Sequence, residues 1–188
     1  MIVSVVYPEE NLLMGDNIVY AEAAFLWVQN LASNELGITI NRIFLGGHSQ
    51  GGYLVTRLNT MHRVDGVIAN SPGPLDMLYR CRQEEEGTMA SSNQCRQLGE
   101  TYGSTVDNPA PYDAISLLGF TSGYSSPFFV VQGMEDAAIQ LHSWPIFKEE
   151  IKGCPDCSSI EVVEAPQVGH VGLFESPMAI EAFNAFVE

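Results

Sequence analysis

The stretch Leu45–Gly52, LGGHSQGG, places four glycines around a single serine, between a predicted strand and a predicted helix. Within it, GHSQG matches the pattern G-x-S-x-G. A serine on a sharp strand-to-helix turn has a strained backbone, and side chains two positions before and after it would collide with neighbouring backbone. We therefore expect Gly47 and Gly51 to be glycine for lack of space, and the Ser49 hydroxyl to project beyond the strand ends.

Apolar runs and helical spacings alternate along the chain outside this stretch. Strands are predicted over residues 2–7, 42–45, 64–69, 127–132 and 159–164, and helices over 16–36, 50–61, 141–151 and 177–187. Gly37 is positioned to end the first helix. This alternation predicts an α/β fold with a doubly wound, mostly parallel sheet of about five strands.

Residues 75–125 differ from the rest of the chain, because they contain no clear strand and are rich in Ser, Gly, Asn, Gln and charged residues. Ligands of doubly wound folds bind at the carboxyl edge of the sheet. We expect one domain over residues 1–188, with 75–125 as a cap-like insertion at that edge.

Composition narrows the possible partners. The chain has 188 residues, of which 46% are hydrophobic, and a net charge of -15 from 8 Lys+Arg against 23 Asp+Glu. Such a surface repels polyanions, so nucleic acid is not an expected partner. No apolar run reaches the roughly 18 residues of a membrane span. The start, MIVSVVYP, lacks the features of a signal peptide and lies within a predicted strand, so we expect either a start within the fold or a Met1 that is not the natural one.

Four cysteines leave three interpretations open. Loop disulfides are favoured, as Cys81–Cys95 with Cys154–Cys157 or as a crossed pairing, while free thiols and a zinc site are the alternatives. The C-x-x-C pair precedes a predicted strand rather than opening a helix, which disfavours a thioredoxin-like role. Disulfides would indicate an oxidising compartment, so cytoplasmic and secreted locations both remain open.

Ser49 needs a base to become a nucleophile, and four histidines are available. His48 lies inside the turn, with its side chain expected to point away from the exposed face of Ser49. His62 ends the following helix, and His142 lies near a helix start. His170 follows the last predicted strand, in a loop between glycines that can bring an imidazole over the serine. We therefore predict His170 as the base.

The base needs an orienting acid, which should follow the penultimate strand. Asp136 and Glu135 both lie there, and we choose Asp136 because the third residue after Gly133 is better placed to turn inward. Asp113 and Asp107 are alternatives from the insertion. The order serine, aspartate, histidine along the chain is that of the α/β-hydrolase type of site.

Three segments carry a family resemblance: the strand–GHSQGG–helix, FFVVQGMED, and APQVGH before a terminal helix. Together they resemble the catalytic core of the α/β-hydrolase superfamily, in its esterase and dienelactone-hydrolase-like branches, with prolyl-oligopeptidase-type peptidases as cousins. The resemblance implies Ser49 as nucleophile, Asp136 as acid, His170 as base and the Gln50 backbone N–H as an oxyanion donor. It implies no metal or organic cofactor.

The amino-terminal side departs from the family pattern. Members usually have eight strands and take a second oxyanion donor from a glycine-rich loop, and no such loop precedes Ser49 here. Either an upstream segment or a partner chain, including a second copy, completes the sheet, or residues 2–7 pair beside the serine strand. In the second case the Tyr7–Asn11 loop would supply the donor.

The predicted function is a serine hydrolase that cleaves small carboxylic esters through an acyl-enzyme intermediate. A peptidase, an acyltransferase and a non-catalytic binding module derived from a hydrolase are the alternatives. Apolar residues of the insertion are candidates to line the pocket: Met77, Tyr79, Leu117, Leu118 and Phe120.

Overall fold

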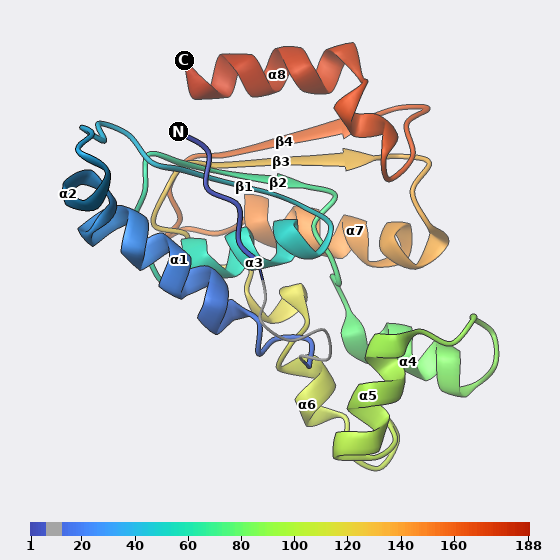
Figure 1. Cartoon of the computed structure of the whole chain (residues 1–188). Helices are drawn as coiled ribbons and strands as arrows, with labels where there is room; N and C mark the ends of the chain where they lie inside the picture. Colours follow the sequence, from blue (N-terminus) through green and yellow to red (C-terminus); the bar gives the residue numbers. More distant parts are fainter. Residues whose placement is uncertain (7–12) are drawn as a thin grey trace.

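The computed structural model describes residues 1–6 and 13–188. Its centre is a parallel sheet in the order β1-β2-β3-β4 (Figure 1). The strands are β1 (Phe44–His48), β2 (Gly66–Asn70), β3 (Phe128–Gly133) and β4 (Ile160–Ala165). All three pairings are parallel. The α/β class and the parallel sheet are thus confirmed, with four strands among the described residues rather than about five.

The strand predicted over residues 2–7 does not form over 2–6, and residue 7 lies outside the described residues. Ile2 and Val6 are 97% and 85% exposed. Val3 and Val5 line a groove beside β1, so the segment lies along the sheet edge without joining it. β-branched residues favour extended backbone, but a strand also needs a hydrogen-bonded partner. β1 therefore pairs only with β2 among the described strands.

Helices cover both faces of the sheet (Figure 1). One face carries α1 (Ile18–Asn30), α3 (Gln50–Asn59) and α7 (Ala138–Lys152), and the other carries α8 (Pro177–Val187). The helix predicted over 16–36 is broken at Leu31 into α1 and α2 (Ala32–Leu36). Gly37 ends α2 with a φ of 64°, as expected for a helix-terminating glycine.

The core is divided by the sheet. Phe128 and Val130 of β3 pack on the face that carries α3 and α7, together with Trp144. Phe129 and Val131 pack on the face that carries α8. This alternation is the period of two expected of a strand, and it buries β3 on both faces. The rigid centre of the sheet then fixes the residues that follow the carboxyl ends of its strands.

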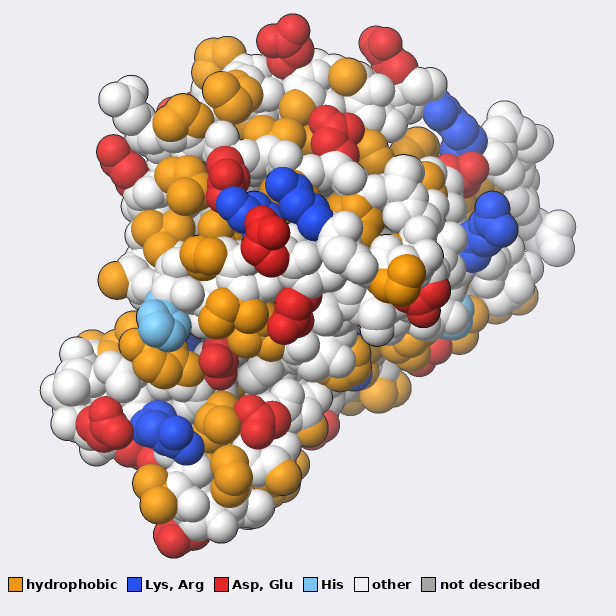
Figure 2. All heavy atoms as spheres, turned by 180° about the vertical axis from the view of Figure 1, so that it is seen from behind, with side chains coloured by type: hydrophobic (Ala, Val, Ile, Leu, Met, Phe, Trp, Pro, Cys, Tyr) orange, Lys and Arg blue, Asp and Glu red, His pale blue; other side chains and the backbone are white. Residues whose placement is uncertain are grey.

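The segment between β2 and β3 contains three α-helices, one 3₁₀ turn (Leu117–Gly119) and no strand, in line with the prediction for 75–125. The α-helices are α4 (Met77–Glu85), α5 (Asn93–Tyr102) and α6 (Ala110–Asp113). In Figure 1, α4 and α5 lie away from the sheet, and they form the smaller lobe at the lower left of Figure 2, while Leu98, Tyr112 and Leu117 of this segment pack into the core beside α3 and α7.

Two disulfides join all four cysteines in the uncrossed pairing. Cys81 of α4 is bonded to Cys95 of α5, and Cys154 is bonded to Cys157 in the turn before β4. The structure therefore supports the first of the three interpretations, because no cysteine is left as a free thiol or as a thiolate ligand for zinc.

The surface agrees with the acidic composition. On the face shown in Figure 2, Lys and Arg side chains are few and stand among Asp and Glu. Among the described residues, no helix is both long enough and apolar enough to span a bilayer.

Candidate active site

Ser49 lies between the end of β1 and the start of α3, with φ 55° and ψ -117°. A positive φ is rare for a residue with a side chain and is strained. Backbone hydrogen bonds fix it: the Ser49 N–H donates to the Asn70 carbonyl at 2.9 Å, and its carbonyl accepts from Tyr53 at 3.0 Å and Gly73 at 3.1 Å. The turn therefore has the sharp geometry that the sequence pattern predicts.

The glycines around Ser49 have different roles. A Cβ on Gly47 would lie 2.1 Å from the Gly51 carbonyl oxygen, so Gly47 is required for lack of space. A Cβ on Gly51 would meet nothing within 4 Å, so the same expectation for Gly51 is wrong. The second close approach is at Gly52, whose Cβ would lie 2.9 Å from the Pro72 Cα. The crowding thus comes from packing of the turn on itself and on the chain after β2.

Asp136 and His170 are directly hydrogen-bonded, with His170 Nδ1 2.8 Å from Asp136 Oδ2. The Asp136 side chain is 2% exposed and also accepts from Gln132 Nε2 at 2.9 Å and from the Ala137 backbone N–H at 2.7 Å. Burial raises the pKa of Asp136, but the hydrogen bonds from His170, Ala137 and Gln132 outweigh it and hold this pKa below its usual range. The carboxylate is therefore ionised and fixes one ring nitrogen of His170.

Gly133 allows the His170 loop to reach this position. A Cβ on Gly133 would lie 2.5 Å from the Val168 carbonyl oxygen. The same carbonyl accepts a hydrogen bond from the Glu135 N–H at 2.8 Å. The loop after β4 thus crosses closely over the end of β3, which brings the imidazole beside the aspartate.

Ser49, Asp136 and His170 line one cavity of about 400 Å³. Gln50 also lines it and is the first residue of α3, so its backbone N–H has no partner within the helix. The dipole at this helix end favours negative charge. The second donor expected from Tyr7–Asn11 falls outside the described residues.

The other candidate acids are placed differently. Glu135 lines the cavity with an exposed side chain, while Asp136 takes the contact with His170. Asp107 accepts from the Ser104 hydroxyl at 2.7 Å, and Asp113 is the exposed last residue of α6. Neither insertion residue lines the cavity.

The remaining histidines have other contacts. His48 lines a second, apolar cavity, and its ring centroid lies 4.5 Å from that of His170. Burial, followed by the charge of His170, lowers the pKa of His48. His62 Nε2 lies 2.7 Å from Glu22 Oε1, and the His142 ring stacks on Tyr79 at 4.0 Å. No sequence pattern predicts that the His48 ring packs against the His170 ring.

Fewer apolar residues of the insertion line the cavity than the sequence predicts. Of the five candidate liners, Met77 is the one that lines it, because Tyr79 stacks on His142 and Phe120 lies under the Arg57 guanidinium. Arg80 also lines the cavity, and no sequence pattern indicates it.

No protein-family model matches the chain, and no curated protein sequence matches it. Solved structures do. A truncated form of a carbohydrate esterase from gut microbiota superposes with a TM-score of 0.70 and 15% identity, over 94% of this chain and 69% of that one. Est1E from Butyrivibrio proteoclasticus gives a TM-score of 0.57 and 19% identity, over 90% of this chain and 71% of that one.

Parts of larger hydrolases have the same fold. The acylaminoacyl peptidase of Pyrococcus horikoshii superposes with a TM-score of 0.67 and 15% identity, over 93% of this chain and 27% of that one. Puromycin hydrolase matches at 23% identity with a TM-score of 0.62, and this chain spans 23% of its length. These proteins share one architecture, so the chain described here has the α/β-hydrolase fold.

Proposed function

We propose that the protein is a serine hydrolase that cleaves carboxylic esters. The observation that carries the proposal is the Asp136–His170 hydrogen bond in the cavity that Ser49 also lines. Nδ1 of His170 faces the carboxylate, which leaves Nε2 for a proton transfer with Ser49. The esterases and peptidases that share the fold support a hydrolase.

The reaction has two half-steps. Ser49 Oγ bonds to the ester carbonyl carbon while His170 takes the hydroxyl proton, and the Gln50 N–H stabilises the oxyanion. The bond to the alkoxy oxygen then breaks, and His170 returns its proton to the leaving alcohol. Water attacks the acyl carbon and gives a proton to His170. His170 then donates this proton to Ser49 Oγ as the bond between Oγ and the acyl carbon breaks and the acid leaves. Asp136 stabilises the imidazolium in both half-steps.

The proposal includes the domain organisation. Residues 1–188 act as a single α/β-hydrolase domain, and the helices of the 75–125 segment form a cap over one side of the Ser49 cavity. Met77, Arg80 and Gln94 of this segment line the cavity together with residues of the sheet edge. The cap would therefore decide which substrates enter, while the loops at the strand ends perform the reaction.

Hydrolysis of 4-nitrophenyl butyrate by the purified chain tests the proposal. Replacing the nucleophile of a serine hydrolase lowers the turnover rate by about 10⁴-fold or more, so Ser49→Ala should lose essentially all activity. Ser33→Ala, at an exposed position of α2, is the matched control and should retain it.

Retained activity in folded Ser49→Ala would contradict the assignment. Peptide cleavage is the second reaction to assay, because the fold is shared with acylaminoacyl peptidase. Cleavage of an acylated peptide at a higher kcat/KM than the ester would favour the peptidase alternative.

A further inference from the structure

Arg80 is the one Lys or Arg side chain among the described residues that line the Ser49 cavity. Basic residues are scarce in this chain, with 8 Lys+Arg against 23 Asp+Glu. The surrounding acidic surface repels anions in general. A cation at this position is therefore an exception in the charge distribution of the chain.

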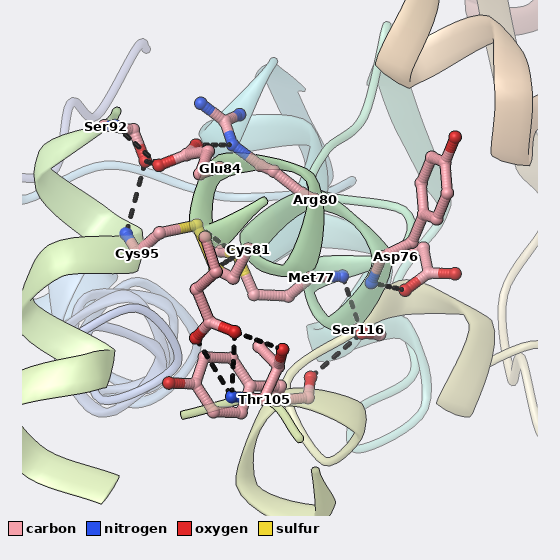
Figure 3. The surroundings of a disulfide bond; sticks show 12 residues. Asp76, Met77, Arg80, Cys81, Glu84, Ser92, Cys95, Thr105 and Ser116 are labelled. Carbon is pink, nitrogen blue, oxygen red and sulfur yellow. Dashed lines mark hydrogen bonds and ion pairs between the residues drawn. A yellow bond between two sulfur atoms is a disulfide. The ribbon is translucent and has the colours of Figure 1, made fainter. Parts of the chain in front are cut away.

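The guanidinium of Arg80 is held by a buried carboxylate. Its Nε donates to Glu84 Oε1 at 3.2 Å, one helical turn along α4, and the Glu84 side chain is 4% exposed. The other oxygen of Glu84 accepts from the Ser92 N–H at 2.6 Å and the Ser92 hydroxyl at 3.0 Å (Figure 3). Ser92 also caps α5 through the Cys95 N–H. These contacts join Arg80 on α4 to the start of α5.

The disulfide stabilises the same arrangement. Cys81 follows Arg80 on α4 and is bonded to Cys95 on α5 (Figure 3). Both sulfur atoms are buried, and Met77 Sδ lies 3.5 Å from Cys81 Sγ. The helix that carries Arg80 is thus fixed relative to the helix that carries Gln94, and both residues line the cavity.

The contact with Glu84 uses only the Nε of Arg80. Within the described residues, no hydrogen bond or ion pair joins its two terminal amino groups to another side chain, and Figure 3 shows them directed away from Glu84. These two groups present four N–H donors in a planar arrangement that suits a carboxylate. The other titratable groups at the cavity are Glu135, Asp136 and His170, and Asp136 already accepts hydrogen bonds from Gln132, Ala137 and His170.

We propose that Arg80 binds a carboxylate group of the substrate, so that the enzyme prefers esters that carry a negative charge. The inference rests on the proposed ester hydrolysis at Ser49. The carboxylate belongs either to the acyl part or to the alcohol part of the ester, since both enter one cavity of about 400 Å³. Arg80 is then a specificity-determining residue.

Two matched substrate pairs test this. The carboxylate is on the alcohol part in 4-acetoxybenzoate, whose neutral counterpart is its methyl ester. It is on the acyl part in mono-4-nitrophenyl adipate, whose neutral counterpart is methyl 4-nitrophenyl adipate. For at least one pair, Arg80→Gln should lower kcat/KM for the charged ester by roughly tenfold or more, mainly through KM, because a hydrogen bond between charged groups is lost. The neutral ester should change by less than about twofold.

Two further variants separate charge from structure. Arg80→Lys keeps the cation and should retain part of the preference for the charged ester. Arg96→Gln removes an arginine with the same i,i+4 pairing, to Glu100 on α5, at an exposed position outside the cavity lining, and should leave both esters unaffected. Equal losses on charged and neutral esters in Arg80→Gln, or an unchanged ratio between them in both pairs, would overturn the proposal.

Inactivity towards every ester would contradict the proposed function. In that case, binding of free carboxylates still tests the role of Arg80. Calorimetric titration of the wild-type chain with adipate and with 4-hydroxybenzoate should show binding of at least one, weakened about tenfold or more in Arg80→Gln. Absence of binding by the wild type, or equal binding by both proteins, would overturn the inference.

Discussion

At the residue scale, the site depends on a serine held in a strained backbone conformation. The φ of Ser49 is 55°, and three backbone hydrogen bonds compensate for the strain. Gly47 allows β1 to approach the first turn of α3 closely. The position of Ser49 at the cavity is thus a consequence of backbone packing.

Two glycines of one motif should respond differently to replacement by alanine. Gly47→Ala should lower the free energy of unfolding by roughly 3 kcal/mol, because its Cβ would meet the Gly51 backbone at 2.1 Å and the turn must move. Gly51→Ala should leave it within about 1 kcal/mol or raise it, since its Cβ meets open space within a helix. Urea denaturation of both variants measures the difference, and equal midpoints would contradict the packing described here.

The sequence predicted individual residues where local chemistry determines their position. The position of Asp136, three residues after Gly133, favours it over Glu135 as the partner of the histidine, and the structure has Asp136 in contact with His170. The sequence does not indicate Gly52 and Arg80, because their importance depends on contacts with segments distant in the chain. No local sequence pattern predicts that a Cβ on Gly52 would clash with Pro72, or that Arg80 lines the same cavity as His170.

At the element scale, the sequence predicts a helix or strand more reliably where the segment packs into the core than where an apolar run lies at the surface. The predicted last helix, 177–187, coincides with α8, and the predicted strand 127–132 differs from β3 by one residue at each end. The segment 2–6 has an equally apolar pattern but forms no strand. Its pattern indicates a preference for extended backbone, but a strand forms only where a neighbouring strand is available for hydrogen bonding.

The pair α4 and α5 gives a prediction at this scale. The Cys81–Cys95 bond closes a loop with a sequence separation of 14, and the Cys154–Cys157 bond closes one of 3. In the chain-entropy description, such bonds contribute about 3 and about 2 kcal/mol respectively. Removal of the first by Cys81→Ala with Cys95→Ala should therefore be the more destabilising, and it also empties two buried positions.

Urea denaturation of the two double variants, each under non-reducing conditions, checks this order. The Cys154→Ala, Cys157→Ala protein is the matched control, because its bond lies in the turn before β4 and outside the cap. An equal or larger loss of stability in that control would contradict the role given to the α4–α5 bond.

At the scale of the whole molecule, the parallel sheet gathers residues that are far apart in sequence. Ser49 follows β1, Asp136 follows β3 and His170 follows β4, and all three strands end at the same edge. The sequence order of strands and helices was sufficient to predict this gathering. It was not sufficient to predict how the 75–125 segment packs, because its three short helices, two of them joined by a disulfide, have little periodicity of their own.

The central claim is that Ser49 is an activated nucleophile, and covalent labelling by a fluorophosphonate tests it most directly. Such a reagent reacts with a serine whose proton is taken by a neighbouring base. Incubation of the folded chain, followed by mass spectrometry of its peptides, should locate one phosphonyl group on Ser49. The label should be absent from the folded His170→Ala protein. A folded wild-type chain that remains unlabelled, or that is labelled at another serine, would contradict the account.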